Sequence, residues 1–298
     1  MLTHNMYIIG FFFIVLLIIY IYYMYMNIIK PKKAVVFDMD ETLGCYLQFG
    51  LFIDILETQL QRDITTEEFN ILMDLYPLYQ RPNILSILNY LKKKKQDGSC
   101  DYIYIYTNNQ GPKSWAIFIK KYFEYKINYP LFDKIIHAYK INGQLIEKNR
   151  TSHDKSVKDF FNCTKISKKT KLCFLDDQYH PRMLNSNVYY LHLKPYHYLY
   201  TPSQLFENFK NYFKLSDEYV LQMQEYGKSI YINYNYFRNE FPPMILENEK
   251  VITKKMLIEI QYFINNFNTI YTRKQNNKKQ LSRKNFTSKK NYPFKYIH

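Results

Sequence analysis

Short runs of β-branched and aromatic residues recur along the middle of the chain, separated by stretches in which apolar residues have helical spacing. Runs of this kind, bounded by polar or turn-forming residues, predict buried strands. Five strands are expected, at residues 34–38, 102–106, 134–139, 172–175 and 188–193. Helices are expected at residues 54–60, 65–78, 81–95, 113–125 and 156–162. Because strands and helices alternate, the pattern predicts an α/β fold in which helices flank a parallel sheet.

The beginning of the chain has a different pattern. Residues 7–29 contain no charged side chain and are almost wholly apolar. About 20 consecutive apolar residues in a helix span the hydrocarbon core of a bilayer. We therefore expect one transmembrane helix, with an anchor at residues 6–29. Because Lys30, Lys32 and Lys33 lie on its C-terminal side, the positive-inside rule predicts a single-pass membrane protein whose remaining chain faces the cytosol.

Composition excludes several classes of protein. The chain has only seven glycines, and no two are close together, which excludes a Gly-rich dinucleotide loop or a Walker phosphate loop. The four cysteines form no C-x-x-C pair, so neither a zinc ribbon nor a disulfide framework is expected. The formal net charge is +15, and residues 273–298 contain nine basic residues and no acidic one.

Acidic residues lie at the predicted carboxyl ends of two strands. Asp38 and Asp40 lie at the end of the first, and Asp176 and Asp177 follow the fourth. Ligands of open parallel sheets bind at this edge. Carboxylates gathered there repel one another unless a cation holds them, and all-oxygen ligation suits Mg²⁺. A carboxylate can also act as a nucleophile. A single residue of this set could be only a strand-end cap, but the combination favours a metal-dependent site.

These residues resemble the motifs of a known family. The sequence Asp38-Met39-Asp40-Glu41-Thr42-Leu43 after a hydrophobic strand resembles the D-x-D-x-T motif of haloacid dehalogenase (HAD) superfamily phosphatases. The family's later signatures follow in order over residues 33–195. They are the strand-end Thr107, a lysine near the start of a helix, Lys155, and the acidic pair Asp176-Asp177.

Two details resemble the branch of CTD phosphatases and NLI-interacting-factor-like phosphatases. One is the D-x-D-E-T-L form of the first motif, and the other is Arg81-Pro82 before the second strand. The loop 107–111, with the sequence T-N-N-Q-G, departs from that branch and is more similar to polynucleotide 3′-phosphatases and histidinol-phosphate phosphatases. The superfamily is therefore indicated more firmly than the branch.

The resemblance implies a catalytic role for each matching residue. Asp38 would attack phosphorus and carry the phosphoryl group, and Asp40 would protonate the leaving group and then deprotonate water. Thr107 would donate a hydrogen bond to a phosphoryl oxygen. Lys155 would pair with the phosphate, with Lys158 as the alternative lysine.

The resemblance also implies a Mg²⁺ cofactor. Its ligands would be the carboxylates of Asp38, Asp176 and Asp177 together with the backbone carbonyl of Asp40. The ion would screen the repulsion between an anionic nucleophile and an anionic phosphate.

The expected domain organisation follows from these assignments. After the anchor come a HAD-like Rossmannoid domain at residues 33–215 and a small helical cap inserted at about residues 44–80. A helix is expected at 203–213, at the end of this domain. A helical extension is expected at 216–272, with a helix at 254–267 and an irregular stretch at 228–250. Residues 273–298 predict a basic, disordered tail. The tail would bind anionic lipid or RNA, or would only aid solubility.

The sequence as a whole predicts a membrane-anchored, Mg²⁺-dependent enzyme that hydrolyses phosphate monoesters through an aspartyl-phosphate. The branch resemblance favours a phosphoprotein substrate, specifically phosphoserine. Two alternatives remain open. One is processing of nucleic-acid ends, as in polynucleotide 3′-phosphatases. The other is a non-catalytic scaffold tethered to the membrane, against which the intact motif residues argue.

Overall fold

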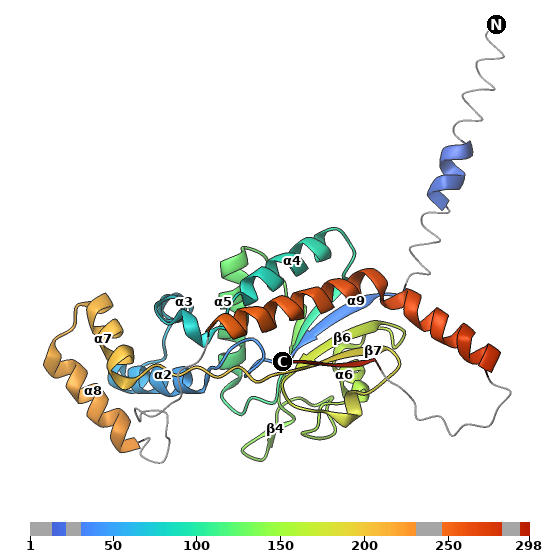
Figure 1. Ribbon diagram of the computed structural model, residues 1–298. Coiled ribbons are helices and arrows are strands. Elements are labelled where there is room, and N and C mark those ends of the chain that lie inside the picture. The colour runs from blue at the N-terminus through green and yellow to red at the C-terminus, as the bar shows by residue number, and fades with distance from the viewer. Residues whose placement is uncertain (1–13, 22–30, 231–245, 282–292) are drawn as a thin grey trace, which may run out of the picture.

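A single parallel sheet forms the centre of the molecule. The computed structural model describes residues 14–21, 31–230, 246–281 and 293–298 (Figure 1). Six strands pair in the order β3-β2-β1-β6-β7-β8, and all neighbouring pairs are parallel. The strands are β1 (Lys33–Phe37), β2 (Tyr102–Tyr106), β3 (Lys134–Ile136), β6 (Lys171–Asp176), β7 (Val188–Leu193) and β8 (Phe294–Ile297). The predicted α/β fold with a parallel sheet is therefore confirmed.

Helices lie on both faces of the sheet. The labelled helices are α2 (Leu47–Leu60), α3 (Thr66–Leu75), α4 (Ile84–Gln96), α5 (Lys113–Ile127), α6 (Val157–Thr164), α7 (Pro202–Phe213), α8 (Asp217–Ile230) and α9 (Leu246–Leu281). Two short 3₁₀ helices, η1 (Pro77–Tyr79) and η2 (Pro181–Met183), and a hairpin of β4 (Lys140–Ile141) with β5 (Gln144–Leu145) complete the described elements. Figure 1 shows α4 and α9 on one side of the sheet and α6 on the other.

Alternation along the strands divides the core in two. Val35 and Phe37 of β1 belong to the larger core, which also includes buried residues of α4, α5 and α9. Ala34 and Val36 belong to a smaller core against α6. Because β1 is buried on both faces, its residues 34–37 are all apolar, as is typical of central strands in parallel sheets.

Several helix ends are explained by local chemistry. A capping box begins α3, because the Thr65 hydroxyl accepts a hydrogen bond from the Glu68 amide while the Glu68 carboxylate accepts one from the Thr65 amide. The helix expected at residues 65–78 stops at Leu75, because Pro77 restricts the residue before it. The helix expected at 54–60 begins earlier, at Leu47.

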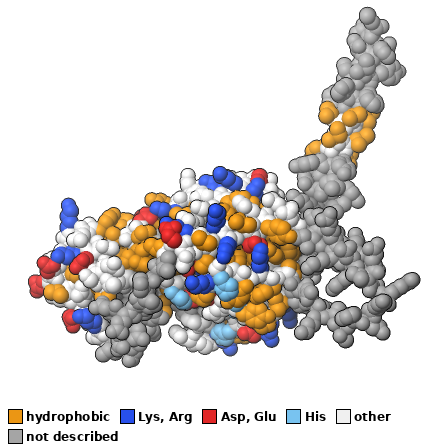
Figure 2. Space-filling model, in the orientation of Figure 1, with side chains coloured by type: hydrophobic (Ala, Val, Ile, Leu, Met, Phe, Trp, Pro, Cys, Tyr) orange, Lys and Arg blue, Asp and Glu red, His pale blue; other side chains and the backbone are white. Residues whose placement is uncertain are grey.

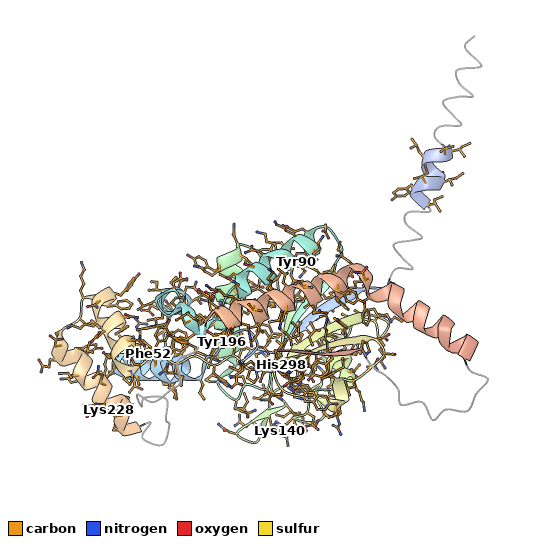
Figure 3. All side chains as sticks on the ribbon, viewed as in Figure 1. Phe52, Tyr90, Lys140, Tyr196, Lys228 and His298 are labelled. Carbon is orange, nitrogen blue, oxygen red and sulfur yellow. The ribbon has the colours of Figure 1, made fainter. Side chains whose placement is uncertain are left out.

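Residues 44–80 are largely helical, as expected for an insert. Helices α2 and α3 and η1 contribute to the larger core rather than forming a separate one. Phe52 of α2, labelled in Figure 3, packs edge-on against Phe206 and Phe209 of α7, with ring centroids 5.6 and 5.4 Å apart. Because α8 also packs against α2, the C-terminal helices support the insert.

The expectation of a disordered tail at residues 273–298 is wrong for the part that the structure describes. Residues 273–281 continue α9, and Phe294–Ile297 forms β8, paired with β7. Ile297 is 3% exposed and belongs to the larger core, while Lys295 pairs with Glu259 of α9. The basic composition of this segment predicted disorder, but β8 is stabilised by pairing with the edge of β7. Residues 282–292 lie outside the described part.

The C-terminal helices are also longer than expected. The helix predicted at 254–267 is α9, which begins at Leu246, and α8 extends to Ile230. The end of α8 and the beginning of α9 lie within the stretch 228–250 that was expected to be irregular. Residues 231–245 lie outside the described part of the chain.

Only residues 14–21 of the anchor expected at 6–29 are described, and they are helical. The rest of that segment lies outside the described residues. Within the described part of the chain, no helix combines the length and the apolar character needed to cross a membrane.

The first prediction concerns the last strand. Ile297→Ala should lower the free energy of unfolding by about 2–4 kcal/mol, because it removes apolar atoms from a close-packed site. The measurement is urea denaturation of the full chain. A disordered tail would predict no change.

Ile258→Ala provides the matched control, because Ile258 is the same residue type on α9 and is 50% exposed. This variant should change stability by no more than about 0.5 kcal/mol. Equal effects of the two substitutions would contradict the role of β8 in the core.

Candidate active site

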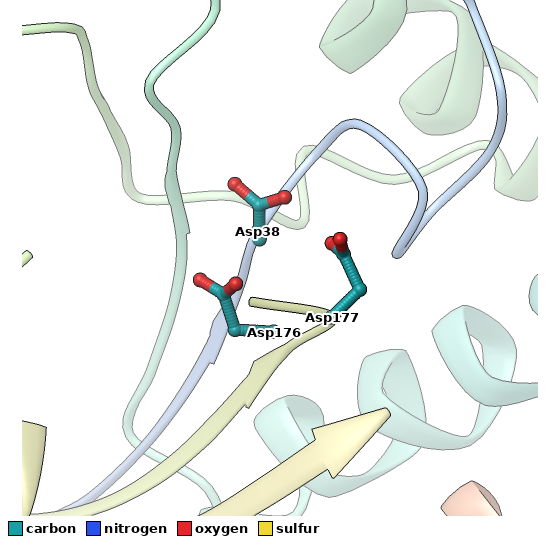
Figure 4. A group of neighbouring side chains, drawn as sticks. All are labelled: Asp38, Asp176 and Asp177. Carbon is teal, nitrogen blue, oxygen red and sulfur yellow. The ribbon is translucent and has the colours of Figure 1, made fainter. Parts of the chain in front are cut away.

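Three aspartates meet where β1 and β6 end. Phe37 of β1 is in register with Leu175 of β6, so the next residues, Asp38 and Asp176, emerge side by side. Asp177 follows directly, and one carboxylate oxygen from each of the three aspartates lies within 4.8 Å of the others. Figure 4 shows the three side chains converging from the two strand ends. The structure therefore brings together the three carboxylates that the sequence placed at strand ends.

Lys155 joins this cluster from the segment before α6. Its ammonium group contacts a carboxylate oxygen of Asp38 and lies 2.7 Å from one of Asp176. The Ser156 hydroxyl accepts a hydrogen bond from the Asp159 amide and so caps the N-terminus of α6. This cap fixes Ser156 and therefore the backbone of Lys155, the residue before it. Lys158, one turn further along, is exposed. Of the two candidate lysines, the structure places Lys155 in the cluster.

The charges in the cluster do not balance. Burial, and to a smaller extent the negative charge of Asp176, raises the pKa of Asp38 well above its ordinary value, although Lys155 acts in the opposite direction. Burial also opposes the charged form of Asp176, but Lys155 and His180 outweigh it and lower the pKa of Asp176. Three buried carboxylates thus face one lysine, which leaves negative charge for a cation to neutralise.

Asp40 lies close by with a different partner. Its carboxylate accepts a hydrogen bond of 2.9 Å from the Asn109 side-chain amide. Burial raises the pKa of Asp40 to about 6, and the bond from Asn109 opposes this shift. An aspartate with such a pKa can both give and accept a proton near neutral pH. No role was assigned to Asn109 from the sequence. The only sequence feature that indicated it was its place in the T-N-N-Q loop after the second strand.

Thr107 is buried at the end of β2. Its hydroxyl oxygen accepts the Asn109 amide proton at 2.9 Å, so the hydroxyl proton itself is left for another acceptor. Arg150 holds the same loop by donating to the Thr107 carbonyl at 3.1 Å and to the Asn108 side-chain oxygen at 2.8 Å. Arg150 supports this loop, and no motif in the sequence indicated it.

Asp177 is held by Thr42, the threonine of the D-x-D-x-T sequence. The Thr42 hydroxyl donates to the Asp177 carboxylate at 3.2 Å. Burial and the charge of Asp176 raise the pKa of Asp177 to about 7. Thr42 therefore connects the loop after β1 to the acidic pair after β6.

Arg81 fixes the loop that carries Thr42. Its guanidinium is fully buried, donates to the carbonyls of Glu41 and Thr42 at 2.6 and 2.8 Å, and forms a 3.0 Å ion pair with Glu249 of α9. The sequence singled out Arg81 only through a family resemblance. Arg81 therefore has a positioning role, because these bonds connect α9 to the loop after β1, which carries Asp40 and Thr42.

The donor set of the cluster fits a metal ion. The group consists of Asp38, Asp176 and Asp177, all of them buried. Carboxylate oxygens are ligands for hard cations such as Mg²⁺ or Ca²⁺. The Asp40 carboxylate is not part of this group and accepts a hydrogen bond from Asn109, and the expected contribution of the Asp40 backbone carbonyl stays a prediction.

Comparison with known proteins adds no assignment. A scan against models of protein families found no match, and a search of curated proteins found none either. The candidate site therefore depends on its own geometry and on the motif resemblance.

The second prediction concerns the pH dependence of stability without metal. The pKa of Asp177 is raised in the folded state, so the folded protein binds this proton more tightly than the unfolded chain. The associated stability is present below about pH 4 and is lost as the pH rises through about 7. Asp177→Asn avoids this loss. In chelator its Tm should match the wild type at acidic pH and exceed it by about 2–4 °C at pH 8.

Asp154→Asn, at a side chain that is 71% exposed, is the control and should not reproduce this difference. Saturating Mg²⁺ should raise the Tm of the wild type more than that of Asp177→Asn. A variant that is less stable than the wild type at pH 8 in chelator would contradict the assigned burial of charge.

Proposed function

We propose that this chain is a Mg²⁺-dependent phosphatase that hydrolyses phosphate monoesters through an aspartyl-phosphate on Asp38. The observation that carries the proposal is the cluster of Asp38, Asp176 and Asp177 around the buried Lys155. Asp40, a further carboxylate two residues after Asp38 in the sequence, has a pKa that burial raises to about 6. The HAD resemblance, found from the same residues, supports the same reaction.

In the first step, an oxygen of Asp38 forms a bond to phosphorus and the bond from phosphorus to the leaving oxygen breaks. Protonated Asp40 gives its proton to that oxygen, so the product leaves as a neutral alcohol. Asn109 holds the Asp40 carboxylate at 2.9 Å and so fixes the direction of the proton transfer.

In the second step, water attacks phosphorus, Asp40 accepts its proton, and the bond between phosphorus and Asp38 breaks to release inorganic phosphate. Lys155 contributes a fixed positive charge beside Asp38, and the raised pKa of Lys155, caused by Asp176 and Asp38 against the effect of burial, keeps it protonated. The Thr107 hydroxyl has a proton to donate to a phosphoryl oxygen.

Asp38, Asp176 and Asp177 would hold the metal ion. When bound, Mg²⁺ supplies charge that screens the repulsion between the carboxylate and the phosphate and stabilises the transferring group.

The proposal extends to the location of the enzyme. We propose that the apolar segment at residues 6–29 anchors the chain in a membrane and that the catalytic domain faces the cytosol. The uncharged head followed by Lys30, Lys32 and Lys33 supports this orientation. The basic residues at 273–290 would bind anionic lipid or RNA, whereas Lys295 lies within β8 and pairs with Glu259.

The third prediction tests the reaction. Asp38→Asn keeps the shape of the side chain but removes the nucleophilic charge. Turnover of a small phosphate ester by the full chain in detergent should fall by at least about 10³-fold, and chelation of divalent metal should have a similar effect. Steady-state release of phosphate is the measurement. Near wild-type turnover by Asp38→Asn would refute the aspartyl-phosphate.

Two lysines on neighbouring turns give a matched pair. Lys155→Met should lower kcat by about 10²–10³-fold, because it removes preorganised positive charge from the phosphate site. Lys158→Met, at an exposed position of α6, should leave kcat within about twofold of the wild type. The opposite ranking would assign the phosphate-binding lysine to Lys158.

The fourth prediction tests the orientation. Asn149 lies in an N-x-T glycosylation sequence. If the domain faces the cytosol, the full chain expressed in cells with a secretory pathway should carry no glycan at Asn149, and its gel mobility should equal that of Asn149→Gln. A glycosidase-sensitive shift that Asn149→Gln abolishes would reverse the proposed topology.

A further inference from the structure

A pocket opens on the side of Asp40 that faces the insert. Its volume is about 390 Å³, within the usual range for small-molecule sites. Its walls come from the loop after β1, from α2, from the loop after β2 and from the start of α5. Asp40 and Asn109 line it, whereas Asp38, Asp176 and Lys155 do not. The pocket thus adjoins the proton donor rather than the metal cluster.

This placement indicates which part of a substrate would enter. In the proposed reaction the phosphoryl group lies at Asp38, and the leaving oxygen must reach Asp40 to receive its proton. The group attached to that oxygen therefore extends past Asp40 into the pocket. The inference rests on the proposed function, and it concerns the chemistry of the leaving group alone.

Apolar atoms make up most of the surface of the pocket. Trp115 and Phe118 of α5 line it, together with Leu47 and Leu51 of α2. Phe69 of α3 holds both aromatic rings, edge-on against Trp115 at 5.6 Å and stacked on Phe118 at 5.1 Å. Rings fixed in this way form a preorganised wall for an apolar group.

The charged residues of the lining are all acidic. They are Asp40, Glu41, Asp54 and Glu57, and none of the described lining residues is Lys, Arg or His. Carboxylates repel a second phosphate, whereas proteins that bind nucleic acid surround the phosphate backbone with basic residues. On the face shown in Figure 2, basic and acidic side chains are interspersed rather than gathered into one basic surface. The pocket is therefore unsuited to the next nucleotide of an oligonucleotide.

We propose that the substrate is a phosphate monoester whose alcohol carries an aromatic or branched apolar group without a further negative charge. This group would lie between Trp115 and α2, while the phosphate lies at Asp38. The proposal disfavours the alternative substrate, a phosphorylated end of a nucleic acid, which the T-N-N-Q loop and the basic tail suggested.

The test compares three esters with the full chain in detergent and Mg²⁺: phenethyl phosphate, carboxyethyl phosphate and a dinucleotide bearing a 3′-phosphate. Burial of the ring should raise kcat/KM for phenethyl phosphate about tenfold or more above the other two. Equal values, or a preference for the dinucleotide, would overturn the proposal and leave the phosphatase function intact.

A variant that fills the pocket tests where the ring binds. Gly50 of α2 lines the pocket, and a Cβ there would lie 3.6 Å from the Trp115 ring, so a larger side chain would enter the space. Gly50→Leu should reduce the ratio of kcat/KM for phenethyl phosphate to that for methyl phosphate by about tenfold. Thr58→Leu introduces the same side chain at an exposed position of α2 and should keep the wild-type ratio.

Trp115, the only tryptophan of the chain, gives a readout that needs no turnover. Phenethyl alcohol should change its fluorescence saturably in the wild type and in Thr58→Leu, but not in Gly50→Leu. If no ester is hydrolysed, the proposed function fails, and this titration still decides whether the pocket binds an apolar group. Absence of a saturable change in the wild type would overturn the proposal.

Discussion

Three buried carboxylates around one buried lysine are the constraint on which this site depends. Two parallel strands, β1 and β6, deliver Asp38 and Asp176 to the same edge of the sheet, where like charges would otherwise separate. Lys155 contacts both, and its own burial is tolerable only because they pair with it. The remaining negative charge makes the same arrangement receptive to a cation, so stability and ligand binding are linked at this point.

A second buried cation extends this constraint to the C-terminal part of the chain. Arg81 donates to two carbonyls of the loop after β1 and pairs with Glu249, so α9 holds the loop that carries Asp40 and Thr42. Strand β8 then covers the edge of β7. Residues that were expected to form an extension and a tail are thus parts of the α/β fold, because α9 holds the loop after β1 and β8 pairs with the edge of the sheet.

Helix α2 has two roles that follow from its position. One side packs into the larger core, where Phe52 meets α7, and the other side forms a wall of the pocket beside Asp40. The acidic and apolar composition of that wall differs from the basic surroundings expected for a nucleic-acid substrate. In the proposed reaction, the phosphate at the aspartate cluster and the alcohol in the pocket would therefore have different environments.

The sequence by itself determined the central strands and the acids at their ends, because a short apolar run bounded by polar residues is stable only when buried. It did not choose between Lys155 and Lys158, since both lie near the start of one helix, and only the docking of α6 directs one of them to Asp38. Nor did it reveal β8, whose pairing depends on an open edge of β7. Arg81 and Glu249 are 168 residues apart, and their pairing is set by the path of the chain. Local patterns report the burial of one segment, whereas the tertiary structure decides which distant charges share a low-dielectric interior.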